Sequence, residues 1–154
     1  MSSNGSLLGS GRRRISDESL HISSFVVVQR EPGSVLLIKA TDAHPLTFRR
    51  GELLLPATML QFGEKPVQAA ERAVATQLSG AEGLEHKFME IQSYMGSHWD
   101  ICLVYEFDAG RAGEIKARAP YADAAFYRLD SLPRGSIAED HLEVIDGLMS
   151  AQSD

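Results

Sequence analysis

The sequence of 154 residues contains one cysteine and no long hydrophobic run. A single cysteine excludes a disulfide within the chain, so a reducing, cytoplasmic compartment is expected. Cys102 itself lies in the apolar run ICLVYEF and is expected to be a small buried side chain. No stretch approaches the roughly 18 apolar residues that span a bilayer, and the N-terminus lacks the apolar core of a signal peptide. These absences predict a protein without a membrane span or leader.

Positive charge is also scarce, with 15 basic against 21 acidic residues and a net charge of −6. Nucleic-acid binding needs a basic stripe, and the only basic cluster is Arg12–Arg14. We therefore expect no nucleic-acid partner. Residues 1–20 are rich in Ser and Gly and are predicted to form a disordered arm. The run RRRIS within this arm is read either as a phosphorylation or anionic-partner site or as a solvated tail.

A single folded domain is predicted over residues 21–150. Its first runs, SSFVVVQR and VLLIKA, are β-branched and nearly continuous in apolar residues. Pro32 and Gly33 between them suit the centre of a type II turn, so the pattern predicts a β-hairpin. Because both faces of these strands are apolar, we expect helices on both sides of the sheet.

The rest of the chain predicts a polar loop over 41–52, a buried segment over 53–60 broken by Pro56, and a helix that begins at Pro66. That helix carries an apolar stripe and is expected to end at Ser79–Gly80; the stripe is Val67, Ala70, Val74 and Leu78. Three strands and a closing amphipathic helix follow, over residues 86–95, 99–107, 125–129 and 139–150. The order predicts an α/β sandwich with a mixed sheet.

The segment LLLPATMLQFGEKPVQAAERAVATQLSG resembles the Nudix box, the loop–helix–loop signature of hydrolases that cleave nucleoside diphosphates linked to another group. Glu64 and Arg72 have the separation of its first glutamate and its arginine, and Val74 falls on its aliphatic position. The resemblance covers residues 21–150 and implies a Nudix-like α/β/α sandwich with a mixed central sheet. It also implies that Glu64 and Arg72 tie the loop to the helix and so serve the shape of the box.

The carboxylates that hold the metal in this family would fall at Ala73, Thr76 and Gln77, and none is a carboxylate here. The spacing i, i+3, i+4 places these three positions on one helical face. A hard divalent cation needs several charged oxygens converging from such a face. The resemblance thus implies a degenerate Nudix box, and no metal cofactor is expected.

Other carboxylates are candidates to replace the missing metal ligands. The resemblance makes Glu139, at the start of the last helix, the candidate for a relocated general base, although an acidic residue there also suits the helix dipole. Glu52 or Glu71 would have to join it to hold a cation. Magnesium or manganese is expected only under this alternative.

Three cationic or aromatic side chains are candidates for ligand binding. Arg49 and Arg50 precede the segment 53–60, where similar proteins place a cation near the substrate phosphates; plain surface charge is the alternative. His98, at the tip between two predicted strands, is a candidate to stack on or bond to a ligand, or is simply a turn residue beside Trp99.

Three functional hypotheses follow. The first is a catalytically impaired Nudix-like domain that binds a nucleotide-like or other phosphorylated ligand, or a protein partner. The second is an active hydrolase with a relocated metal and base site. The third is a structural interaction module, such as a homodimer, whose cleft is filled by side chains.

Overall fold

The computed structural model describes residues 20–96 and 98–153. The predicted arm lies outside these residues apart from Leu20, with which the first strand begins. The strands are β1 Leu20–Gln29, β2 Ser34–Ala40, β3 Leu53–Leu54, β4 Ala57–Met59, β5 Leu78–Ser79, β6 Glu85–Met95, β7 Trp99–Asp108, β8 Lys116–Ala117 and β9 Tyr121–Arg128. The helices are α1 Pro66–Gln77 and α2 Glu139–Ser153, with short 3₁₀ turns at Thr47–Arg49, Leu129–Ser131 and Arg134–Ser136.

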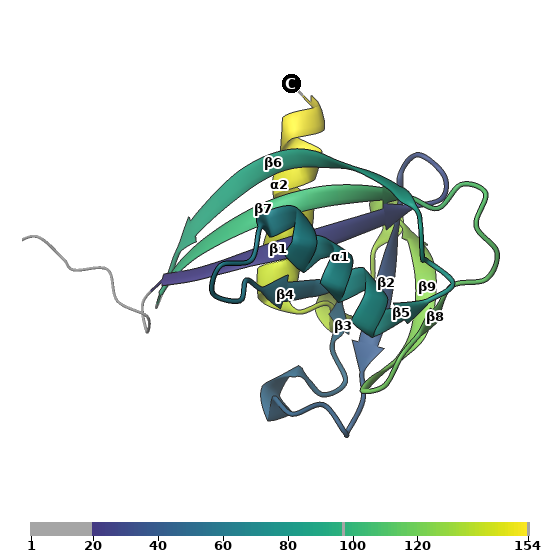
Figure 1. Cartoon of the computed structure of the whole chain (residues 1–154), viewed down its shortest axis with the longest axis horizontal. Coiled ribbons are helices and arrows are strands. Elements are labelled where there is room, and N and C mark those ends of the chain that lie inside the picture. Colours follow the sequence, from purple (N-terminus) through teal and green to yellow (C-terminus); the bar gives the residue numbers. More distant parts are fainter. Residues whose placement is uncertain (1–19, 97, 154) are drawn as a thin grey trace, which may run out of the picture.

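The strands form two main sheets between two helices. One sheet has the order β4-β1-β7-β6 and is mixed, because β1 and β7 run parallel while the other pairs are antiparallel. The second sheet has the order β3-β2-β9, and β5 pairs with β8. Helix α1 lies in front of the first sheet and α2 behind it (Figure 1). The predicted α/β/α sandwich with a mixed central sheet is confirmed.

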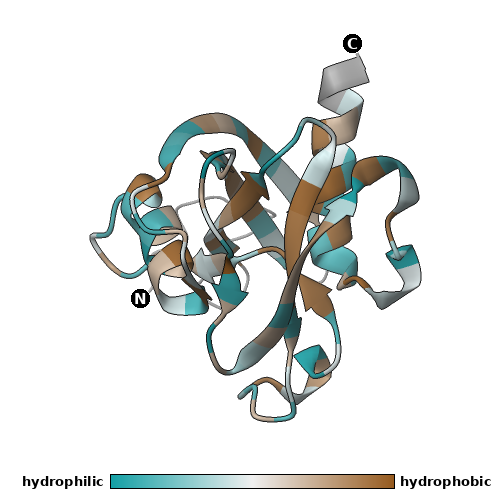
Figure 2. Ribbon diagram, turned by 90° about the vertical axis from the view of Figure 1, so that its right-hand side faces the viewer, coloured by the Kyte–Doolittle hydropathy of each residue, from teal (hydrophilic) through white to brown (hydrophobic). Residues whose placement is uncertain are grey.

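Both faces of β1 are buried, as its continuous apolar run predicts. Val26 and Val28 pack into the core under α1, whereas Phe25 and Val27 pack into the core under α2. Successive side chains of a strand point to opposite faces, so one strand supplies both cores. Hydrophobic residues accordingly concentrate on the central strands (Figure 2). Among the described residues, no helix is long and apolar enough to cross a membrane.

The predicted hairpin between the first two strands is wrong, although its turn is present. The Ser34 amide donates to the Glu31 carbonyl at 3.2 Å, and Gly33 has φ of 81°, as a type II turn requires. However, β1 pairs with β7 along its whole length, and β2 pairs with β3 and β9. The turn brings the strands together at one end, but distant partners decide the pairing because both strands are buried on both faces.

Helix α1 begins at Pro66 as predicted and ends at Gln77, before the predicted end at Ser79–Gly80. Leu78 and Ser79 leave the helix because they pair with β8. Gly80 follows with φ of 87°, and a Cβ there would collide with the carbonyl of Glu114. The chain therefore leaves α1 through a fixed, narrow turn.

Candidate functional site

The first feature of the α1 region is an ion pair between the helix and the loop before it. Arg72 Nε donates to Glu64 Oε2 at 2.9 Å, and Nη2 donates to Glu64 Oε1 at 2.9 Å. The hydrogen bonds from Arg72, followed by one from the Gln61 amide, lower the pKa of Glu64 to about 2. Two parallel bonds fix both distance and angle, so this fork sets the entry of the loop into α1.

The same guanidinium also holds the strand before the loop. Arg72 Nη1 donates to Thr58 Oγ1 at 3.2 Å, and Nη2 donates to the Met59 carbonyl at 2.9 Å. Four hydrogen bonds from one side chain thus join α1 to β4 and to the loop. The donors of Arg72 point at protein atoms, which is the geometry of a structural arginine.

The three positions where the family places metal-binding carboxylates have different surroundings. Ala73 is fully buried in the core under α1. Thr76 is exposed, and its hydroxyl donates to the Arg72 carbonyl at 2.8 Å. Gln77 is 8% exposed and faces β4. The spacing places the three positions on neighbouring parts of the helix, but only Thr76 faces solvent.

Gln77 binds the backbone of β4 through both ends of its amide. Its Nε2 donates to the Ala57 carbonyl at 2.8 Å, and its Oε1 accepts from the Ala57 amide at 3.3 Å. A carboxylate could accept from the amide, but its second oxygen would face the carbonyl and would need a proton or a cation between them. The neutral amide satisfies both backbone groups without either.

These residues do not fit a magnesium ion. Magnesium is held by carboxylates together with water and phosphate oxygens. Positions 73, 76 and 77 supply a methyl group, a hydroxyl and an amide, and the hydroxyl and the amide already bind protein atoms. No reaction step can therefore be derived through a metal at α1.

Two of the three replacement carboxylates are paired with basic side chains. Glu52 lies 3.4 Å from Arg49, and Glu71 lies 3.1 Å from His86. Glu139 is exposed at the start of α2. In the described part of the chain, none of the three belongs to a group of potential ligands that could share one cation.

Of the two loop arginines, Arg49 binds protein carboxylates. Its Nη1 and Nη2 donate to the two oxygens of Asp140 at 2.8 and 2.6 Å. The hydrogen bond to Asp140 is the main reason that the pKa of Arg49 is raised, and burial opposes the shift. Arg50 is exposed, and its Nε donates to the His44 carbonyl at 3.0 Å. Arg50 is therefore the more accessible of the two candidates.

Residues 139–141 make different contacts, which the sequence does not reveal. Asp140, rather than Glu139, reaches the 41–52 loop. His141 is buried, and its Nδ1 accepts from the Leu55 amide at 3.0 Å. Burial lowers the pKa of His141 to about 4, which keeps it neutral. The cluster thus anchors α2 to the rest of the fold.

His98 does not lie at α1. Its Nε2 is 3.2 Å from Asp100, and its ring stacks against His21 at the beginning of β1 and β7. The predicted ligand candidates are therefore not brought into one site.

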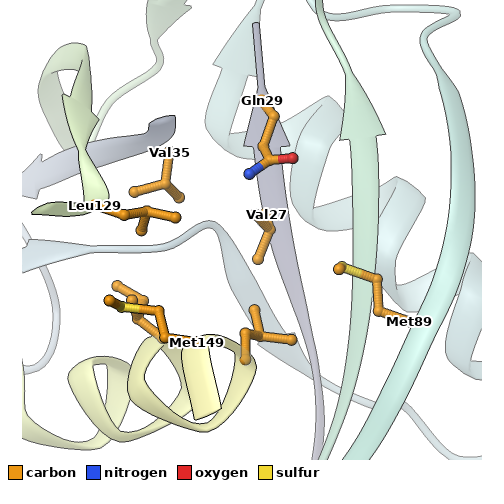
Figure 3. A pocket seen from close by; sticks show the side chains of 8 residues that line it. Val27, Gln29, Val35, Met89, Leu129 and Met149 are labelled. Atoms are coloured by element: carbon orange, nitrogen blue, oxygen red, sulfur yellow. The ribbon is translucent and has the colours of Figure 1, made fainter. Parts of the chain in front are cut away.

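A separate hollow lies on the α2 side of the sheet. It has a volume of about 320 Å³ including the part open to solvent, and β1, β2, β6 and α2 contribute to its lining (Figure 3). Its lining is Val27, Gln29, Val35, Met89, Leu129, Ile145, Leu148 and Met149. Among the described residues that line it, the amide of Gln29 is the only polar side chain, and none of them is a charged group that could hold a phosphate.

Comparison with known proteins places this geometry in a known fold. No family model and no curated protein matches the chain. Similar solved structures include a MutT NUDIX hydrolase from Burkholderia pseudomallei, at TM-score 0.63 and 18% identity over 82% of this chain and 96% of that one. A MutT protein from Methanosarcina mazei Go1 matches at TM-score 0.65 and 12% identity, over 90% and 99%.

A third similar structure is the NUDIX domain of Shewanella oneidensis NrtR, complexed with ADP ribose. It matches at TM-score 0.63 and 16% identity over 99% of both chains. Identities this low establish the fold alone, because one fold can carry many functions. The chain has the Nudix fold.

Proposed function

We propose that this chain is a catalytically impaired Nudix-fold protein that binds a nucleotide-like or other phosphorylated ligand, or a protein partner, without hydrolysing it. One observation carries the proposal: at the three metal positions of α1, one side chain is buried in the core and two bind backbone groups of the protein. A close charge pair contributes about 1 to 4 kcal/mol at effective dielectrics of 80 to 20, so three absent carboxylates remove most of the attraction for a divalent cation.

The 41–52 loop offers contacts for the ligand. Phe48 is 65% exposed, and the guanidinium of Arg49 lies 4.9 Å from its ring centre. Arg50 is exposed two residues further on. An aromatic face can stack on a base, and an arginine can pair with a phosphate. Phe48 and Arg50 are the ligand contacts that we propose.

The loop is braced, which favours such a role. His44 is buried, its Nε2 lies 3.2 Å from the Tyr121 hydroxyl, and its Nδ1 accepts from the Leu46 amide. The fork between Arg49 and Asp140 holds the other end of the loop. A pre-ordered loop loses less conformational entropy when a ligand binds.

ADP-ribose is the first probe, because one structure of the same fold is complexed with it. The experiment is calorimetric titration of ADP-ribose into the whole chain, followed by incubation with magnesium or manganese and chromatography of the nucleotide. We expect binding with the nucleotide recovered intact. Phe48→Ala and Arg50→Gln should each weaken binding by at least about fivefold. Phe88→Ala and Lys87→Gln, which change an exposed ring and an exposed cation on β6, should not.

Turnover would contradict the proposal. If metal-dependent hydrolysis occurs and disappears in Glu139→Gln, the second hypothesis, an active enzyme with a relocated site, is correct. If ADP-ribose, ATP and UDP-glucose all fail to bind, the proposal that this chain binds a nucleotide-like ligand is wrong. A stable dimer in solution would then favour the third hypothesis, an interaction module.

A further inference from the structure

Two histidines and an aspartate share one face of the mixed sheet at the beginning of β1 and β7. His21 of β1 is the register partner of Asp100 of β7, and the two strands are parallel. Paired residues of parallel strands point to the same face of a sheet. His98 lies two residues before Asp100, just ahead of β7, and reaches the same carboxylate. The backbone register therefore brings together three side chains that are distant in sequence.

The Asp100 carboxylate contacts both imidazoles. Its Oδ1 is 3.7 Å from His21 Nδ1, and its Oδ2 is 3.2 Å from His98 Nε2. The two rings are 4.2 Å apart between centroids and tilted by 42°. One ligand atom from each residue can be chosen so that all three lie within 4.8 Å of one another.

We infer that His21, His98 and Asp100 form a binding site for a divalent transition-metal ion such as zinc. Tetrahedral zinc has bonds of about 2.0 to 2.2 Å, which separates its ligand atoms by about 3.3 to 3.6 Å. The observed atoms would have to close by about 1.5 Å at most, which side-chain rotation can supply. Two neutral imidazoles and one carboxylate carry a net charge of −1, which suits a dication.

The accessibility and the ligand types decide which ion fits. The side chains are about one-third exposed, at 32%, 36% and 32% for His21, His98 and Asp100, so water can occupy a fourth position. Imidazole suits zinc, copper and nickel, whereas magnesium prefers oxygen ligands. The site is therefore chemically different from a magnesium site at α1.

An ordinary histidine–carboxylate contact elsewhere provides a matched control. His86 Nε2 lies 3.1 Å from Glu71, and the His86 ring packs on Phe107. This pair has one imidazole and one carboxylate, and among the residues that the structure describes it belongs to no three-ligand group. Removing His86 changes the number of surface histidines without touching the proposed site.

The experiment is calorimetric titration of zinc into the tag-free chain, repeated with cobalt(II) and visible spectroscopy to report the coordination number. We expect one zinc per chain. His21→Gln, His98→Gln and Asp100→Asn should each weaken binding by at least about tenfold. His86→Gln should bind within about twofold of the wild type. Melting without metal checks that each variant remains folded.

The site would be overturned by the absence of stoichiometric zinc uptake by the folded wild type, or by uptake that survives Asp100→Asn unchanged. Loss of uptake in His86→Gln alone would place the metal elsewhere and would equally overturn it. Zinc binding here predicts nothing about ADP-ribose, so this site and the proposed function stand or fall separately.

Discussion

The two sides of α1 meet the surrounding chain in different ways. The loop side, Glu64 and Arg72, is charged and joins the helix to the preceding loop through a forked ion pair. The sheet side, Ala73 and Gln77, is neutral and meets the core and the backbone of β4. A charged pair thus holds the loop against the helix, while the next turn of that helix, residues 73–77, carries no charged side chain.

Placing a carboxylate on the sheet side should have the largest effect. Ala73→Glu would bury a charge in a packed core and should lower the free energy of unfolding by about 4 kcal/mol. Chemical denaturation measures it. Ala75→Glu is the control, because Ala75 is exposed on the same helix and should change stability by no more than about 0.5 kcal/mol. Equal stability of the two variants would show that position 73 opens to solvent.

The amide of Gln77 provides the second test. Gln77→Glu replaces the donor that faces the Ala57 carbonyl and should lower the free energy of unfolding by about 2 kcal/mol at pH 7. The new carboxyl can donate only when protonated, so its pKa should be raised in the folded state. The loss of unfolding free energy relative to the wild type is then complete at neutral pH and should shrink as the pH falls toward 4.

Gln68→Glu is the matched control for this change. Gln68 only accepts, from the Lys65 amide at 3.0 Å, and a carboxylate accepts equally well. This variant should keep wild-type stability between pH 7 and pH 4. If Gln77→Glu behaves in the same way, the donor role of Gln77 is wrong.

Removing the ion pair on the loop side should lower stability more moderately, and its effect should depend on pH in the acidic range. Arg72→Met should lower Tm by about 4 °C at pH 7. Because the fork lowers the pKa of Glu64 from 4.5 to about 2, its contribution is present above pH 4.5 and is lost as the pH falls to 2. Thermal melts across this window should show a shallower loss for Arg72→Met than for the wild type. If Tm falls equally steeply with pH in both proteins, the fork does not lower the pKa of Glu64.

The smallest effect is expected at Thr76, which lies on neither side. Thr76→Glu adds a carboxylate on an exposed surface and should change the free energy of unfolding by no more than about 0.5 kcal/mol. It should also give no magnesium-dependent turnover of ADP-ribose, because one carboxylate cannot replace three. Turnover in this variant would show that the α1 face needs only one ligand.

Local patterns predict much of this fold. Pro66 marks the start of α1, Pro32 and Gly33 mark the type II turn, and the apolar run around Val26 predicts a strand buried on both faces. These features depend on neighbours in sequence or on a strand's own alternation. The eight-residue spacing of Glu64 and Arg72 lies within the loop and helix that bring them together.

Features set by distant contacts could not be predicted. The pairing of β1 with β7 depends on competition between strands. The fork between Arg49 and Asp140 joins residues 91 positions apart. The side chain of Gln77 points inward because β4 lies beside α1. The periodicity of a helix does not reveal which strand lies next to it.

Magnesium titration of the Asp100→Asn variant tests the central claim most directly, because this variant removes the proposed transition-metal site and leaves α1 intact. We expect no stoichiometric heat and no change in Tm at millimolar magnesium, since α1 offers no carboxylate at positions 73, 76 and 77. Uptake of one magnesium ion per chain would contradict it.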